Sequence, residues 1–203
     1  MANDRGQHTL PPVVNRINVL ILLLYSPGYS EDVNEPISGR TRLQKQTFLV
    51  QQQLRSLGAK SMYSFRPYKL GPLSYELYND IEWLKLEGVV SEKINTLPDG
   101  TKFSRFELDE KGVREASSLL EDPNWAYVYN IVKAIKKVTN ALDLSTLVES
   151  VHETFPEYVL KTPFAIERLL ESFSASQSPH ETELASTPRK KRPGASRVGQ
   201  EDS

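Results

Sequence analysis

The chain has 203 residues, no cysteine and a net charge of −1, with 38% hydrophobic and 25% charged residues. This composition indicates a globular protein with one buried core, and it excludes disulfide-stabilised folds and thiol chemistry. The three histidines are far apart in the sequence and lack the spacing of metal ligands, so no metal site is expected.

The first apolar segment, residues 13–25, predicts a buried helix, and the polar residues 1–10 before it are expected to be loose. The run from Val19 to Tyr25 is too short to span a bilayer. No small-residue cleavage site follows it, so it is not interpreted as a signal peptide. Because this helix is apolar nearly all round, its excess apolar surface could also serve a dimer contact.

Residues 40–57 predict a second helix, which Ser38 or Thr41 could cap and Gly58 ends. Its expected core residues are Leu43, Phe48, Leu49, Val50, Leu54 and Leu57. Arg40, Arg42 and Lys45 crowd the first turns, where the helix macrodipole disfavours cations. This placement indicates either a function for these charges or simple solvation.

The segment from Phe65 to Gly88 runs through a Gly-Pro break into a third helix, with Pro72 expected in the first turn. Residues 60–70, which overlap the start of this segment, could form a short strand in which Tyr63, Phe65 and Tyr68 pack. Four apolar residues fall on one face of this helix at helical spacing and are predicted to face the core: Leu73, Leu77, Ile81 and Leu84. The solvent side is expected to hold Tyr75, Glu76, Asp80, Glu82, Lys85 and Glu87.

Two alternating segments around Pro98-Asp99-Gly100 predict a β-hairpin. Its expected packing positions are Val90, Ile94, Phe103, Phe106 and Leu108. Further helices are expected after Asp109, Asp122, Asp143 and Thr162, and the second of these has a basic side formed by Lys133, Lys136 and Lys137. From Ser174 onward the Ser-, Pro- and charge-rich sequence predicts disorder.

This order of elements predicts a mainly α fold with a small β-hairpin wing (α+β), a winged helix-turn-helix with a C-terminal helical extension. The expected parts are a flexible N-terminus (1–10), a winged-helix domain (11–122), a helical extension packed on it (123–173) and a disordered tail (174–203).

Three segments carry a resemblance to a known family: GRTRLQKQTFLV (39–50), FRPYKLGPLSYELYNDIEWLKLEGVV (65–90) and LVESVHETFPEYVLKT (147–162). In this order they resemble the prokaryotic YwgA-like family, which is described as winged-helix-like. Phage-associated SocA-like antitoxin domains share a similar Gly-Pro-containing helix start. The resemblance implies a regulator found near mobile elements or phage-defence genes. Gln46 and Thr47 depart from the apolar pair expected there, so that turn is either less buried or lined against polar groups.

The distribution of charge suggests a basic surface, although the net charge of −1 by itself gives no reason to expect a nucleic-acid partner. Seven basic residues and no acid lie between Glu35 and Glu76, whereas twelve acids lie from Glu76 to Asp122. In a DNA-reading winged helix the third helix enters the major groove and cations contact phosphates. The expected nucleic-acid-binding residues are Arg40, Arg42, Lys45, Arg66, Lys69, Ser74, Tyr75, Tyr78, Lys102 and Arg105.

Each of these residues also has a structural interpretation. Lys45 could be the buried partner of Asp80 or Glu76, the segment 66–68 could pack as a strand, and Lys102 and Arg105 could be solvated. The acidic third helix could instead bind protein, with the apolar first helix, in an adaptor or an antitoxin-like subunit of a defence complex.

No enzyme is predicted. The sequence has no Gly-rich phosphate loop, and His152, Glu153 and Glu157 lack a partner motif. No cofactor is therefore expected, and the basic tail Arg189–Arg192 is a candidate for nonspecific DNA contact. The leading hypothesis is a cytoplasmic winged-helix transcriptional regulator that binds double-stranded DNA and no membrane, associated with a mobile-element or antiviral-defence locus.

Overall fold

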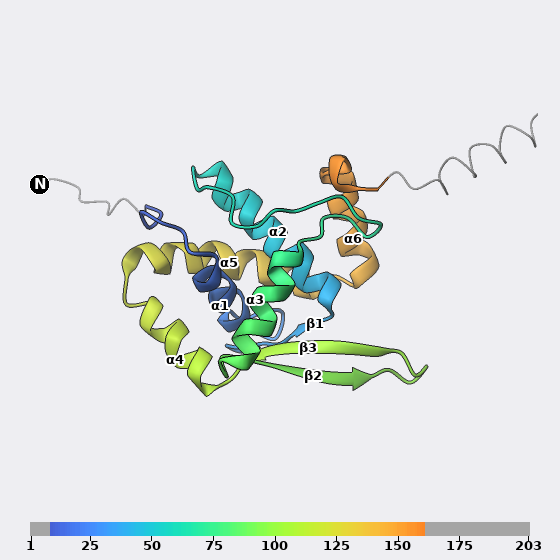
Figure 1. Cartoon of the computed structure of the whole chain (residues 1–203), viewed down its shortest axis with the longest axis horizontal. Coiled ribbons are helices and arrows are strands. Elements are labelled where there is room, and N and C mark those ends of the chain that lie inside the picture. The colour runs from blue at the N-terminus through green and yellow to red at the C-terminus, as the bar shows by residue number, and fades with distance from the viewer. Residues whose placement is uncertain (1–8, 161–203) are drawn as a thin grey trace, which may run out of the picture. The chain divides into compact units, whose positions relative to one another are not determined.

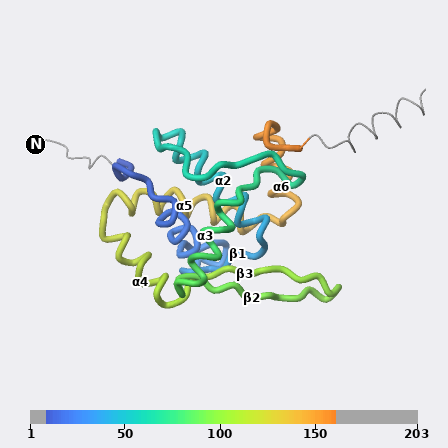
Figure 2. The backbone as a smooth tube through the Cα atoms, viewed as in Figure 1, coloured from blue at the N-terminus to red at the C-terminus, as the bar shows by residue number. Residues whose placement is uncertain are grey.

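The computed structural model describes residues 9–160, which belong to one compact unit, Met1–Thr162. In this part of the chain six α-helices and a three-stranded antiparallel sheet form an α+β fold (Figures 1 and 2). The helices are α1 (Arg16–Tyr25), α2 (Arg40–Ser56), α3 (Tyr75–Leu86), α4 (Glu110–Leu119), α5 (Pro123–Ala141) and α6 (Leu144–Thr154), followed by the 3-10 helix η1 (Pro156–Tyr158). The strands are β1 (Ile37–Ser38), β2 (Val90–Thr96) and β3 (Lys102–Leu108). The helix expected after Thr162 and the tail from 174 lie outside the described residues, as do residues 1–8.

The predicted hairpin is confirmed. β2 and β3 pair antiparallel from Val90↔Leu108 to Thr96↔Lys102, and the sheet order is β1-β3-β2. The two-residue strand β1, which was not expected in its loop, pairs with β3 on the other edge. Val90, Phe106 and Leu108 are buried as predicted. Ile94 is 60% exposed, because the far half of the hairpin extends away from α1, α3 and α4 (Figure 1).

The centre of the core is α1. Its residues Val19 to Leu24 are each 0–2% exposed, and the helix packs against α4, α5 and β3. The chain itself therefore covers the apolar surface that suggested a dimer contact. α5 adds Trp125, Val128 and Val132 to the same core, so it is an integral part of the compact unit. No helix within residues 9–160 has the length and apolar character needed to cross a membrane.

The helix α2 is buried on more sides than its apolar pattern predicts. It begins after Gly39, whose φ of 97° is a left-handed conformation, and neither Ser38 nor Thr41 caps it. Leu57 is exposed, since the helix ends at Ser56. Its fully buried polar residues are Gln44, Lys45, Gln46, Thr47 and Gln51. The segment before α3 covers Gln44, Lys45 and Gln51, which donate hydrogen bonds to the carbonyl oxygens of Ser74, Pro72 and Tyr63.

Gln46 confirms the expectation of a polar lining. Its Nε2 donates hydrogen bonds to Thr139 Oγ1 and Asn140 Oδ1 of α5, at 2.8 and 2.7 Å.

The helix α3 begins later than predicted. Its N-cap is Ser74, so Pro72 and Leu73 precede the helix and the expectation for both was wrong. The backbones of Leu73 and Arg66 exchange hydrogen bonds of 2.8 and 3.0 Å, which hold Leu73 in an extended conformation. Leu77, Ile81 and Leu84 are buried as predicted.

Asp80, which was expected on the solvent face of α3, is buried. Its carboxylate forms an ion pair with Arg16 at the start of α1, with 2.8 Å between Arg16 Nε and Asp80 Oδ2. In the segment 60–70 the expected strand is replaced by isolated bridges, and Tyr68 is exposed instead of packed.

Lys136 does not belong to a basic side of α5. Its side chain is fully buried, and its Nζ donates hydrogen bonds to the carbonyl oxygens of Leu24 and Ser26, at 2.8 and 2.7 Å. A cation at this position satisfies the last carbonyl groups of α1. Burial lowers the pKa of Lys136 to about 7.

Candidate interaction surface

Two of the predicted DNA-binding residues lie in the interior. Lys45 is 2% exposed, and its Nζ donates to the carbonyl oxygen of Pro72 at 2.8 Å. This contact is with a backbone carbonyl and not with the carboxylate of Asp80 or Glu76, and burial lowers the pKa of Lys45 to about 8. Ser74 is also fully buried, and its backbone N–H and C=O are paired with the side chain of Gln44. Neither side chain can reach a ligand at the surface.

Arg42 is turned towards the end of α5. Its guanidinium donates to the carbonyl oxygens of Thr139 and Leu142, the latter at 2.8 Å. These carbonyls lie at the C-terminus of a helix, where a cation is favourable. Arg42 therefore joins α2 to α5, which is why its assignment to a phosphate contact fails.

Arg40 lies at the surface but is paired within the chain. Its Nη2 is 2.8 Å from Glu92 and 3.7 Å from Glu82, and its guanidinium carbon is 5.7 Å from the ring centre of Tyr78. The carboxylate of Glu92 also accepts a hydrogen bond of 2.6 Å from Lys85. These contacts connect the first turn of α2 with α3 and β2.

The remaining basic candidates are exposed. Arg66 and Lys69 lie in the segment before α3, and Lys102 and Arg105 lie on β3. Within residues 9–160 none of the four forms an ion pair. The five bases expected to act together, Arg40, Arg42, Lys45, Arg66 and Lys69, thus do not all contribute to one surface.

An exposed stripe on α3 is the feature that the charge pattern missed. Tyr75, Trp83 and Leu86 are 62%, 49% and 87% exposed. Together with the exposed residues Asn79 and Glu82 they occupy positions i, i+4, i+7, i+8 and i+11, which form one face of a helix. This face lies opposite Leu77, Ile81 and Leu84. We call these five residues the α3 stripe, and its helical spacing is already visible in the sequence.

The surroundings of the α3 stripe are acidic. Glu82 belongs to it, and Glu87 follows directly after the helix. The base on α3, Lys85, is already bound to Glu82 and Glu92, at 2.9 and 2.6 Å. A stripe of aromatic and aliphatic groups beside acids lacks the unpaired cations that contact phosphates.

Two hollows that share Leu144 lie beside α6, which Figure 1 shows in orange. The first, of about 420 Å³, is bounded by the start of α2, by Ile94 and by Phe103. The second, of about 610 Å³, is bounded by Leu70 and by the face of α6 that contains Leu144 and Val148. Leu144 lines both. We call the two together the α6 groove.

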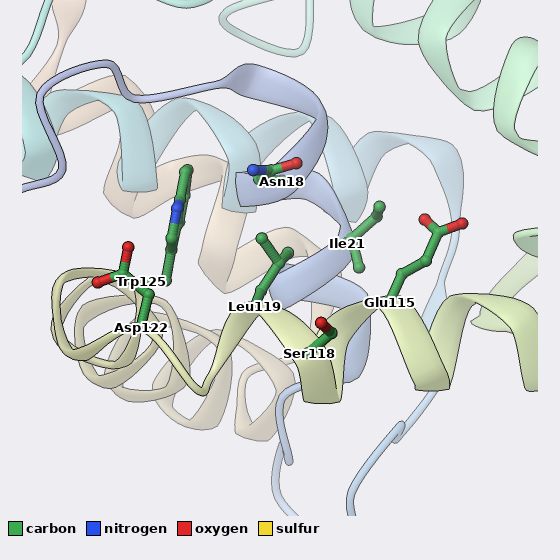
Figure 3. A pocket seen from close by; sticks show the side chains of 7 residues that line it. All are labelled: Asn18, Ile21, Glu115, Ser118, Leu119, Asp122 and Trp125. Carbon is green, nitrogen blue, oxygen red and sulfur yellow. The ribbon is translucent and has the colours of Figure 1, made fainter.

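A further hollow of about 340 Å³ lies between α1, α4 and the start of α5 (Figure 3). Figure 3 shows the ring of Trp125 standing at one side, with Leu119 in the middle and Ile21 beyond Leu119, towards Glu115. The carboxylate of Asp122 at its edge already accepts a hydrogen bond of 2.8 Å from the N–H of Asn124, as the N-cap of α5. We therefore interpret this hollow as a gap between packed helices.

In the part of the chain that the structure describes, no three or more His, Cys, Asp or Glu side chains are grouped so that they could hold a metal ion. No protein-family model matches the chain, and no curated protein matches its sequence. The resemblance to the YwgA-like family therefore stays a prediction.

Proposed function

We propose that the chain is a winged-helix protein whose α3 stripe binds another protein, as an adaptor or as a subunit of a larger complex. The order α1, β1, α2, α3, β2, β3 and the sheet order β1-β3-β2 support the winged-helix assignment. The third helix of such a domain is the usual element of recognition, and here its exposed side is the α3 stripe.

The exposure of Tyr75, Trp83 and Leu86 on one helix face is the observation that carries this proposal. Tyrosine and tryptophan are enriched at the energetic centres of protein interfaces. A helix face with apolar groups at i, i+8 and i+11 fits a groove or a second helix of a partner.

DNA binding is the second candidate, and the exposed cations favour it. Arg66 and Lys69 precede the start of α3, where Tyr75 is exposed, and Lys102 and Arg105 lie on the wing. These residues would make phosphate contacts at the edges of α3, while the body of the helix would contribute little. Either function is compatible with the regulatory or defence-associated role that the resemblance implies.

Purification of the tagged full-length chain from its native cells tests the leading proposal. The proposal predicts a stoichiometric protein partner that stays bound after nuclease treatment and is lost in Leu86→Lys and Trp83→Gln. Both residues are exposed and both replacements favour helices, so the fold is expected to be kept. The matched control is Val138→Lys, since Val138 is an apolar residue of α5 that is 63% exposed. A partner that Leu86→Lys and Val138→Lys retain equally well would contradict the proposal.

A further inference from the structure

We propose that the α6 groove is a second docking site, which binds an amphipathic helix of a partner protein. The bound helix has an apolar stripe with basic residues on one flank and an acidic residue towards the hairpin. This site shares no residue with the α3 stripe, so it stands or falls independently of the proposed function.

Exposed apolar side chains contribute to the lining of both hollows of the α6 groove. Ile94 on the hairpin is 60% exposed, and Leu144 and Leu70 are each 40% exposed. Leu144, at the start of α6, lines both hollows. The larger hollow, about 610 Å³, has room for several side chains of a ligand, in the range of typical binding pockets. Covering the apolar groups exposed in a hollow of this size removes them from water, which lowers the free energy of the complex.

One face of α6 offers a line of residues against which a helical occupant can lie. Leu144, Val148 and His152 lie at i, i+4 and i+8, so they follow one line along α6. Leu70 bounds the same hollow from the segment before α3. An occupant that lies along this line places its own residues at i, i+3 or i+4, and i+7 against it, as amphipathic helices do in apolar grooves.

The charges at the rim define the flanks of the occupant. Glu149 and Glu153 lie along the α6 side, and Lys102 lies at the hairpin end. All three are exposed, and within residues 9–160 none of them forms an ion pair. Arg40, the other base at the hairpin end, is already paired with Glu92. A basic flank over α6 and an acidic residue near Lys102 complement this pattern.

A second copy of the chain fits this rim less well. A two-fold contact through α6 centred on Val148 would bring Glu149 close to the Glu149 of the other copy. Like charges so placed oppose association, whereas a partner with a basic flank is attracted.

Selection from a helix-biased peptide display library against the full-length chain tests this inference. The expected consensus has apolar residues at helical spacing, Lys or Arg on one flank and Asp or Glu on the other. The selected peptides should bind Val148→Glu about tenfold or more weakly, and Leu144→Lys likewise. The double variant Glu149→Lys with Glu153→Lys should bind the peptides more weakly. Peptides whose basic flank is replaced by acidic residues should bind this variant and restore the affinity. Leu86→Lys in the α3 stripe should bind the peptides as the unchanged chain does.

Three results would overturn the inference. One is a selection that enriches no peptide, or only peptides without helical spacing. Another is a set of peptides that binds Val148→Glu and Leu144→Lys as tightly as the unchanged chain. The third is that the unchanged chain sediments as a dimer and Leu144→Lys sediments as a monomer, which would assign the groove to self-association. Far-ultraviolet circular dichroism checks that each variant is folded, and Leu144, which is partly exposed already, provides the variant least dependent on packing.

Discussion

Arg40 Nη2 lies 2.8 Å from Glu92 Oε1, and this contact ties the start of α2 to the strand β2. The side chain of Glu92 is only 6% exposed, and Lys85 of α3 donates to its other oxygen at 2.6 Å. Burial alone would raise the pKa of Glu92, but hydrogen bonds from Lys85, Ser104 and Arg40 lower it to about 2. An arginine expected to contact phosphates thus holds α2, α3 and the hairpin together.

Replacing Glu92 tests this structural role. Glu92→Gln should lower the free energy of unfolding at pH 7 by about 1–3 kcal/mol, measured by urea denaturation, because two cations lose their buried partner. The folded pKa lies below the ordinary value of 4.5, so the charge of Glu92 stabilises the fold above that value and loses its effect as the pH falls towards 2. The difference between the two proteins should therefore shrink in acid.

The control for this experiment is Glu82→Gln. The side chain of Glu82 is half-exposed, and surface ion pairs contribute at most about 1 kcal/mol. Equal losses of stability in Glu82→Gln and Glu92→Gln would contradict the assignment of Glu92 as the central partner.

Lys45 should behave as a core residue. Lys45→Ala should reduce the free energy of unfolding by about 2–5 kcal/mol, because it leaves a cavity and removes the donor to the carbonyl oxygen of Pro72. Lys45→Met keeps most of the volume and should cost clearly less. The comparison by urea denaturation is decisive, since a solvated or DNA-contacting lysine would tolerate both changes with little loss.

Lys136 should make stability depend on alkaline pH. The unfolded chain holds a proton on this lysine up to its ordinary pKa of 10.5, whereas the folded chain releases it near 7. The unfolded state binds more protons in this window, so the free energy of unfolding contributed by this group rises with pH, by up to about 1.4 kcal/mol per pH unit. Lys136→Met should lack this rise. Parallel slopes for the two proteins between pH 7 and 10 would contradict the burial of the charge.

The helices and the hairpin follow from local patterns, whereas the fate of the basic residues depends on distant segments. Leu77, Ile81 and Leu84 define the inner face of α3 by spacing alone, and the Pro98-Asp99-Gly100 turn defines the hairpin. The partners of Arg42 lie 97 and 100 residues further along the chain. No local pattern shows that the segment before α3 covers Lys45, so in the sequence this lysine has the features of a surface residue.

The same reasoning explains the error at Asp80. Its place among acids on α3 predicts a solvent-exposed face, but Arg16, 64 positions earlier, reaches it from the buried helix α1. The α3 stripe could have been found by marking which apolar residues of α3 fall outside the core spacing. Trp83 and Leu86 are the residues that such a count identifies.

The second candidate function gives a distinct result in a salt series with duplex DNA. If the exposed cations contact phosphates, the logarithm of affinity falls steeply with the logarithm of salt concentration. Arg66→Gln combined with Lys69→Gln should then reduce that slope by about 2, or 1 for each lost contact, whereas Lys45→Met should leave it unchanged. An affinity that does not respond to salt, or no binding at low salt, would exclude DNA binding by these residues.

Site-specific photocrosslinking at Asn79 tests the central claim most directly, because Asn79 lies in the middle of the α3 stripe and is exposed. The full-length chain would carry a photoreactive amino acid at Asn79 or, as a control, at Val138, and would be irradiated in the cells that naturally produce it. We expect a protein adduct of defined mass from Asn79 that survives nuclease treatment and is absent from Val138. An adduct that nuclease removes, or the absence of any adduct specific to Asn79, would contradict the assignment of the α3 stripe as a protein-binding surface.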